Sequence, residues 1–166
     1  MGNSKTYDLF VTHAWRFHED WTKFTELMDK IPGLLWRNFS LPWHDPAISP
    51  NTEAGGRFIR SSLESQIIPV HIVVLLAGVY EIRSARVWVD MEVEMAKRHN
   101  KPIIAMPAIN KDSIPGELVA LCDARSEWDG SRLIATIDEV RSLPEYATQP
   151  EGRWFGYDAS VDDDKS

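Results

Sequence analysis

Two hydrophobic patterns alternate along the chain, one typical of buried strands and the other typical of helices. Short runs rich in Val and Ile predict strands that are covered on both faces. We expect five strands, at residues 7–13, 35–41, 70–78, 101–106 and 124–128. The third and fourth have this buried pattern, whereas residues 35–41 are more mixed in polarity and predict a strand nearer the edge of the sheet. Apolar residues spaced three and four apart predict the intervening helices, at residues 20–31, 57–68, 86–100, 118–122 and from 129 onwards. Asp20 is the expected N-cap of the first helix.

Strands that alternate with helices predict an open α/β fold, with a parallel five-stranded sheet and helices on both faces. The common order for such a sheet is 2-1-3-4-5, which leaves a ligand crevice at the carboxyl ends of strands one and three. Residues 12–16 and 78–81 follow these two strands and are expected to line the crevice. Residues 42–56 hold three prolines and two glycines, which predict a long loop over the same end of the sheet, without helix or strand.

One acidic residue, Glu92, interrupts the apolar side of the helix predicted over residues 86–100. At about 100° per residue it falls among apolar side chains on the helical wheel. A carboxylate in that position costs several kcal/mol unless it is paired, protonated or directed into a cleft. Glu92 is therefore the main candidate for chemistry. The structural alternative is a hydrogen bond to a backbone amide or an ion pair with Arg57, Arg60 or Arg83.

Four further residues are expected near the crevice, where aromatic and imidazole rings suit a planar ligand: His13, Trp15, His44 and Tyr80. Each also has a structural interpretation. His13 is equally compatible with a strand-end residue that the backbone satisfies. His44 is compatible with a turn ahead of a proline, and the two aromatic residues with packing at the rim.

Length and charge limit the organisation and the partners. The 166 residues suffice for one α/β domain, expected at residues 1–143, followed by a tail at residues 144–166 that ends in acidic residues. The net charge of −7 argues against nucleic acid as a partner, because phosphate binding requires clustered Lys and Arg. The apolar runs are too short to cross a bilayer, and no signal-peptide pattern opens the chain. We therefore expect a cytoplasmic protein without a membrane segment.

Several common chemistries lack their motifs. Five scattered histidines and one cysteine do not provide the close ligand spacing of a zinc site, so no metal is expected. The single cysteine also excludes an intrachain disulfide. Neither GxGxxG nor GxxxxGK occurs, which argues against a Rossmann dehydrogenase and a P-loop enzyme. A Ser-His-Asp triad stays open, although no serine lies in a GxSxG setting.

Two motifs at a suitable separation make the chain resemble TIR domains. Residues 7–13 are YDLFVTH, close to the first-strand pattern of that family, and residues 88–92 are WVDME, a W-x-x-x-E motif in the helix after strand three. The stretches FVTHAW, NFSLPWHDP, VVLLAGVY and KPIIAM are more similar to the prokaryotic branch found in the Thoeris anti-phage defence system. The resemblance covers residues 7–140. Two departures are Thr12-His13 in place of the usual serine and a loop without the receptor-type arginine-aspartate-proline signature.

This resemblance implies a flavodoxin-like sheet and cleavage of the bond between nicotinamide and ribose in NAD. Glu92 is then the catalytic residue, and NAD contacts are expected from His13, Trp15, His44, Tyr80 and Trp88. NAD is a substrate in this scheme, and no cofactor is expected. In the Thoeris branch the expected product is a cyclic ADP-ribose isomer that activates a separate effector.

The implied partners are a phage-derived trigger, the effector reached through the nucleotide signal, and further copies of the chain in a homo-oligomer. A second function from another class stays open. As the alternative to the enzyme, the chain is compatible with a TIR-like interaction module without catalysis, which recognises a phage component or assembles with itself.

Overall fold

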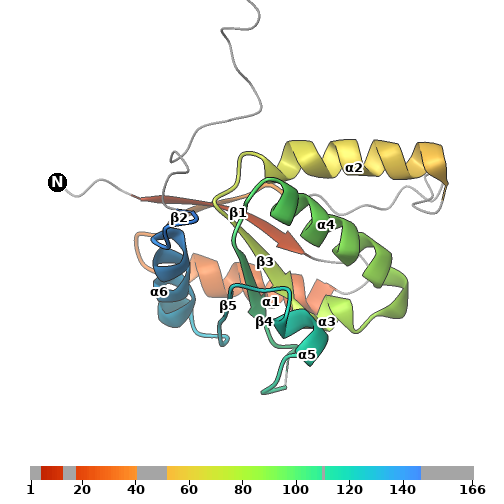
Figure 1. The fold of residues 1–166 in the computed structure, drawn as a ribbon. Helices are drawn as coiled ribbons and strands as arrows, with labels where there is room; N and C mark the ends of the chain where they lie inside the picture. The colour runs from red at the N-terminus through yellow and green to blue at the C-terminus, as the bar shows by residue number, and fades with distance from the viewer. Residues whose placement is uncertain (1–4, 13–17, 41–51, 110, 147–166) are drawn as a thin grey trace, which may run out of the picture.

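A parallel sheet lies at the centre of the molecule, between two layers of helices (Figure 1). The computed structural model describes residues 5–12, 18–40, 52–109 and 111–146. Within these residues the sheet has the order β2-β1-β3-β4-β5, and every neighbouring pair is parallel. The strands are β1 (Thr6–Thr12), β2 (Leu35–Asn38), β3 (Ile72–Leu76), β4 (Ile103–Met106) and β5 (Ala124–Arg125). The predicted α/β flavodoxin-like fold and its strand order are therefore confirmed.

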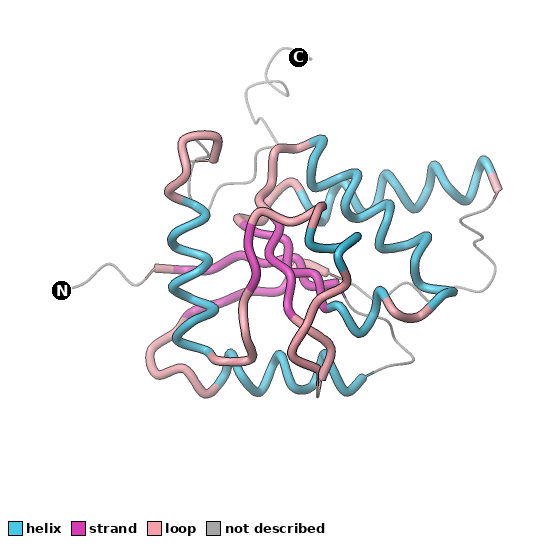
Figure 2. The backbone as a smooth tube through the Cα atoms, turned by 60° about the horizontal axis from the view of Figure 1, so that its bottom comes forward, coloured by secondary structure: helices cyan, strands magenta, loops and turns pink. Residues whose placement is uncertain are grey.

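Helices cover both faces of the sheet. In Figures 1 and 2, α2 and α4 lie together on one face, and α1 and α6 lie on the other. The helical elements are α1 (His18–Asp29), α2 (Glu53–Ile67), α3 (Ala77–Tyr80), η1 (Arg83–Ala85), α4 (Arg86–Arg98), α5 (Gly116–Val119) and α6 (Gly130–Arg141). The central strands are apolar on both sides, and every residue of β3 and β4 is buried. This pattern is the one expected of strands between two helical layers.

The register brings the carboxyl ends of the two central strands together. Thr12, the last residue of β1, pairs with Leu75 in β3, one residue before that strand ends. The connections after β1 and β3 diverge at this edge, because β2 lies on one side of β1 and β4 lies beyond β3. The expected switch point therefore lies at this edge of the sheet.

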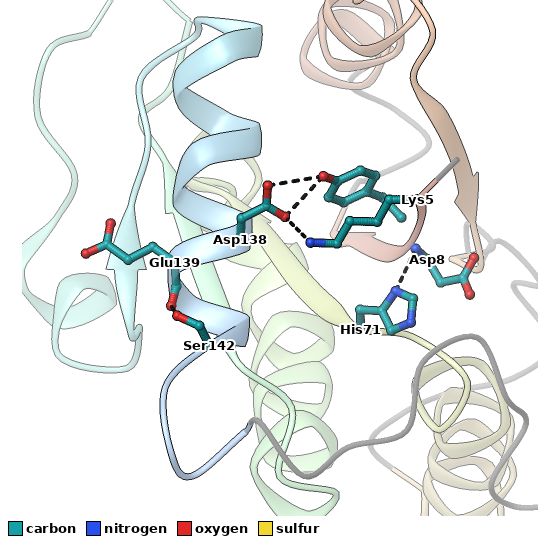
Figure 3. Close-up of polar contacts among 7 residues, drawn as sticks. Lys5, Asp8, His71, Asp138, Glu139 and Ser142 are labelled. Atoms are coloured by element: carbon teal, nitrogen blue, oxygen red, sulfur yellow. Dashed lines mark hydrogen bonds and ion pairs between the residues drawn. The ribbon is translucent and has the colours of Figure 1, made fainter. Parts of the chain in front are cut away.

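At the amino ends of the strands, polar contacts join β1 to α6 and to the residue that precedes β3 (Figure 3). Asp138 in α6 accepts hydrogen bonds from Lys5 Nζ at 2.8 Å and from the Tyr7 hydroxyl at 3.1 Å. The Asp8 amide donates to His71 Nδ1 at 3.2 Å, just before β3 begins. Because that nitrogen accepts a backbone proton, this contact is made by an imidazole that carries no proton on Nδ1.

The prediction for residues 42–56 is wrong at its carboxyl end, because α2 begins at Glu53. Thr52 is the N-cap, and its side chain accepts a hydrogen bond from the Gly55 amide at 3.1 Å. The cap, together with Glu53 in the first turn, compensates for the low helix propensity of two consecutive glycines. Residues 41–51 lie outside the described residues.

Other boundaries also differ from the prediction. The first helix begins at His18, so Asp20 lies in its first turn and is not the N-cap. The third strand ends at Leu76, and the chain enters α3 directly instead of extending to residue 78. The short helix expected at residues 118–122 is displaced to α5, which follows Pro115. Each error concerns a boundary where capping and tertiary contacts outweigh the local pattern.

Candidate functional site

The side chain of Glu92 lies within the buried face of α4. Its exposed fraction is 6%, and its buried neighbours along the helix are Val89, Met91, Val93, Met95 and Ala96. The helical wheel predicted this position on the apolar side of α4, and the structure confirms it. The carboxyl group is therefore removed from bulk water on the side of α4 that packs against the rest of the domain. The ligand-sized hollow that the carboxyl was expected to face stays a prediction.

The partner of this carboxyl is the hydroxyl of Thr12. Thr12 Oγ1 donates a hydrogen bond to Glu92 Oε2 at 2.8 Å, and Thr12 itself is only 2% exposed. The bond joins α4 to the carboxyl end of β1 across 80 residues of sequence. It places Glu92 at the edge of the sheet where the connections after β1 and β3 diverge.

Burial dominates the acidity of Glu92. It raises the pKa from 4.5 to about 8, and the hydrogen bond from Thr12 acts in the opposite direction because it stabilises the ionised form. The carboxyl is therefore mostly neutral at pH 7. Perturbed carboxyl groups of this kind are found preferentially at functional sites.

The ion pairs considered for Glu92 are made elsewhere. Arg57 pairs with Glu53 at 3.6 Å and Arg60 pairs with Glu94 at 3.9 Å. Both pairs are exposed, whereas Glu92 is buried with a neutral hydroxyl as its partner. Arg57 and Arg60 therefore pair with other carboxylates and not with Glu92.

Tyr80 lies at the end of α3 and is held by two neighbours. Its hydroxyl donates to Glu117 Oε2 in α5 at 2.9 Å, and the Arg86 guanidinium lies over its ring at 4.9 Å from the centroid. The bond to Glu117 is the main cause that raises the pKa of the Tyr80 hydroxyl, whereas the charge of Arg86 acts in the opposite direction. Both contacts favour the packing interpretation of Tyr80, and its contact with NAD stays a prediction.

Trp88 lies one helical turn before Glu92 on α4. It is partly buried and packs against the hydrophobic core. This placement agrees with a packing neighbour of the carboxyl, whereas an NAD contact stays a prediction. The other three predicted ligand contacts, His13, Trp15 and His44, lie outside the described residues.

A second carboxyl group at this edge of the sheet belongs to Asp20, which the sequence predicted only as a helix N-cap. Asp20 projects from α1 towards Gly78 in α3, so closely that a Cβ on residue 78 would overlap with the Asp20 carboxyl. Burial raises the pKa of Asp20, with a further contribution from Glu19 and Glu81. The sequence signal was a glycine two residues after an apolar strand, because glycine allows close approach of another group.

The described residues contain neither a cluster of metal-binding side chains nor a helix of membrane-spanning character. No group of three or more His, Cys, Asp or Glu residues is arranged there to hold a metal ion. Over the same residues, none of the helices is both long enough and apolar enough to span a bilayer.

Comparison of the chain with protein-family models and with curated proteins gave no match. Among solved structures, a CMP N-glycosidase from Clostridium botulinum is similar in structure, with a TM-score of 0.41 and 10% sequence identity. The similarity covers 79% of this chain and 98% of the other. At this level of similarity we infer nothing about activity from it, and the fold assignment follows from the sheet topology.

Proposed function

We propose that the protein cleaves the bond between nicotinamide and ribose in NAD, with Glu92 as the catalytic residue. The observation that carries the proposal is the buried Glu92 carboxyl, hydrogen-bonded to Thr12 at the carboxyl end of β1. An α/β sheet binds its ligands at this end, beside the switch point. The W-x-x-x-E motif at residues 88–92 and the first-strand motif, which resemble those of TIR domains, support NAD as the substrate.

One carboxyl group suffices for this reaction because nicotinamide is a good leaving group. Ordinary glycosidases use two carboxyl groups, since a sugar alkoxide leaves poorly without a proton. In NAD the C1′–N bond breaks with its electron pair going to the nicotinamide nitrogen, which becomes neutral. The positive charge that develops at C1′ is stabilised by ionised Glu92, and a low local dielectric strengthens this interaction.

The second half of the reaction decides the product. A nucleophile forms a new bond to C1′ and releases one proton to solvent. With water the products are ADP-ribose, nicotinamide and a proton. With a nucleophile from the same dinucleotide they are a cyclic ADP-ribose isomer, nicotinamide and a proton, which requires that water be excluded. We propose the cyclic product, because the motifs resemble the Thoeris branch, and with it a separate effector, a phage-derived trigger and action in the cytoplasm.

The test is nicotinamide release by cells and extracts that contain the protein. Extract from phage-infected cells expressing the wild type is incubated with NAD, and the products are identified by chromatography and mass spectrometry against cyclic isomers. Glu92→Gln keeps the shape of the side chain, and we expect release to fall about 100-fold or more. Glu94→Gln is the matched control, because Glu94 is exposed on the same helix.

The outcomes separate the two functions that the sequence left open. Full release by the Glu92→Gln variant would show that another residue is catalytic. No release by the triggered wild type, combined with retained protection of cells against phage, would favour the non-catalytic interaction module.

A further inference from the structure

At the carboxyl end of β1, Thr12 places a hydroxyl group in the core, at a position where an apolar side chain would also pack. Thr12 follows the apolar residues Leu9, Phe10 and Val11 and is as buried as they are. A buried hydroxyl without a partner costs about 1–3 kcal/mol, so its placement requires an acceptor. That acceptor is Glu92 Oε2, at 2.8 Å.

We infer that Thr12 is a positioning residue for Glu92, whose hydroxyl holds one carboxyl oxygen and leaves the other for the substrate. This inference rests on the proposed function. Within the described residues, Thr12 is the hydrogen-bond partner of Oε2, and no hydrogen bond reaches Oε1. A carboxyl on a long side chain rotates about its last torsion, which is broad. Fixing one oxygen orients the other, and a fixed orientation raises the fraction of productive encounters with C1′.

The hydroxyl also shifts the pH range of activity, because it lowers the Glu92 pKa that burial raises. The charged groups nearby have other contacts, and Asp20, the second carboxyl at this edge, lies against Gly78. In α2, which packs on α4, Arg60 pairs with Glu94 and Glu64 with His99. Beside α3, Glu81 pairs with Lys111.

On the remaining elements, Arg86 lies over the Tyr80 ring, while Asp90 and Arg83 are exposed. The facing residues of β3 are apolar. Burial and the Thr12 hydroxyl are what act on the pKa of Glu92 within the described chain. His13, the next residue after Thr12, lies outside the described residues. The experiment therefore has to change the Thr12 hydroxyl while leaving His13 unchanged.

The kinetic test compares Thr12→Val with Thr12→Ser. Valine keeps the volume of threonine and removes the donor, whereas serine keeps the donor, and neither changes His13. We expect kcat/KM for nicotinamide release to rise with pH in the wild type and to level above pH 8, because ionised Glu92 is the active form and kcat/KM reports the free enzyme. In Thr12→Val the plateau falls about tenfold and the rising limb moves about one unit to higher pH. Thr12→Ser restores both.

A second measurement needs no substrate. The δ-carbon of glutamate is labelled with ¹³C, the Glu92 signal is assigned by its loss in Glu92→Gln, and its titration is followed in each variant. We expect the Glu92 pKa to rise in Thr12→Val and to return in Thr12→Ser, because the lost donor stabilised the ionised form.

The two measurements distinguish failure of the inference from failure of the proposed function. If the wild type releases nicotinamide and Thr12→Val leaves both the pH profile and the titration unchanged, Thr12 is a packing residue and the inference is overturned. If the triggered wild type releases no nicotinamide but the titration still moves in Thr12→Val, the proposed function is overturned and the coupling between the two side chains stands.

Discussion

The buried carboxyl of Glu92 makes the stability of the fold depend on pH. Its pKa is about 8 in the folded chain and near 4.5 in the unfolded chain. Between these values the folded state binds more protons, so the free energy of unfolding decreases as pH rises, by about 1.4 kcal/mol per pH unit. The contribution is complete below pH 4.5 and is lost as the pH rises through 8. Glu92→Gln removes this loss, so we expect the variant to gain stability over the wild type between about pH 5 and about pH 9, measured by urea denaturation.

The buried amine of Lys101 also makes stability depend on pH. The effect of Glu92 is therefore measured as the difference in stability between Glu92→Gln and the wild type. Burial lowers the pKa of Lys101 to about 8, so its own contribution to stability is lost as the pH falls from 10.5 through 8, opposite in sign to that of Glu92. The difference between the variant and the wild type cancels Lys101, which both contain. A difference that stays constant with pH would mean that the Glu92 pKa is not raised in the fold.

Close contact between Asp20 and Gly78 gives a second prediction for single residues. A Cβ at position 78 would overlap with the Asp20 carboxyl, so in Gly78→Ala the Asp20 side chain has to turn away, which we expect to destabilise the fold by about 0.5–1.5 kcal/mol. Thermal and chemical denaturation would measure the effect. In the double variant Asp20→Ala/Gly78→Ala part of the loss should be recovered, because the two residues are in contact. Strict additivity of the two changes would contradict this contact.

The sequence can predict which side of its own helix or strand a residue occupies, because this depends only on the local periodicity. Glu92 could be identified because its position on α4 depends only on helical periodicity. Its partner Thr12 was placed at the crevice but not paired with Glu92, because that contact depends on how α4 lies across β1. For the same reason the bond from Tyr80 to Glu117 and the approach of Asp20 to Gly78 were missed. Contacts between elements are set by packing, which a local pattern does not encode.

At the scale of the elements, an ion pair reinforces the backbone pairing with β1 and the packing of Trp36 that attach the edge strand β2. Its residues alternate between exposed and partly buried, and Arg37 reaches the buried Asp8 carboxyl with two bonds, at 2.6 and 2.8 Å. Arg37 also lies over the Phe39 ring. The short mixed pattern at residues 35–41 predicted an edge position, and the structure confirms it with a shorter strand.

Arg37→Met should therefore loosen β2. The substitution leaves the Asp8 carboxyl buried without its ion pair, which we expect to cost about 1–3 kcal/mol because Arg37 is itself half exposed. Adding Asp8→Asn should restore part of this loss, since no buried charge then remains. Hydrogen exchange of the β2 amides, alongside urea denaturation, would locate the effect. Unchanged exchange in β2 would show that the ion pair does not hold this strand.

Across the whole molecule, the carboxyl ends of the parallel strands (the carboxyl edge) and their amino ends (the amino edge) hold different sets of contacts. The carboxyl edge brings together Thr12 and Glu92, while the amino edge holds the contacts of Lys5 and Tyr7 with Asp138. Alternation of strands and helices was enough to predict this architecture, because few topologies satisfy a parallel sheet with short connections. No such rule predicts the contacts of His13, Trp15 and His44, which were expected at the carboxyl edge and lie outside the described residues.

The separation of edges predicts that the end of the described chain stabilises the fold without affecting the reaction. The Tyr146 hydroxyl donates to Asp123 Oδ1 at 2.9 Å, and the Glu145 carbonyl accepts from Asn100 Nδ2 at 2.7 Å. Asp123 in turn accepts the Ile103 amide at the start of β4, so residues 145 and 146 dock on the amino edge of the sheet. A chain ended at residue 143 should unfold at a lower temperature than one ended at residue 146, by about 1–3 kcal/mol in free energy.

Tyr146→Phe in the chain ended at residue 146 is the matched control, because it removes one hydrogen bond and keeps the ring. It should lie between the two truncated chains in stability, and all three should share the same pH profile of nicotinamide release, since Thr12 and Glu92 are untouched. A changed profile would mean that the two edges are coupled through the sheet. The amino edge would then join in controlling the carboxyl group, and the assignment of separate tasks to the edges would be wrong.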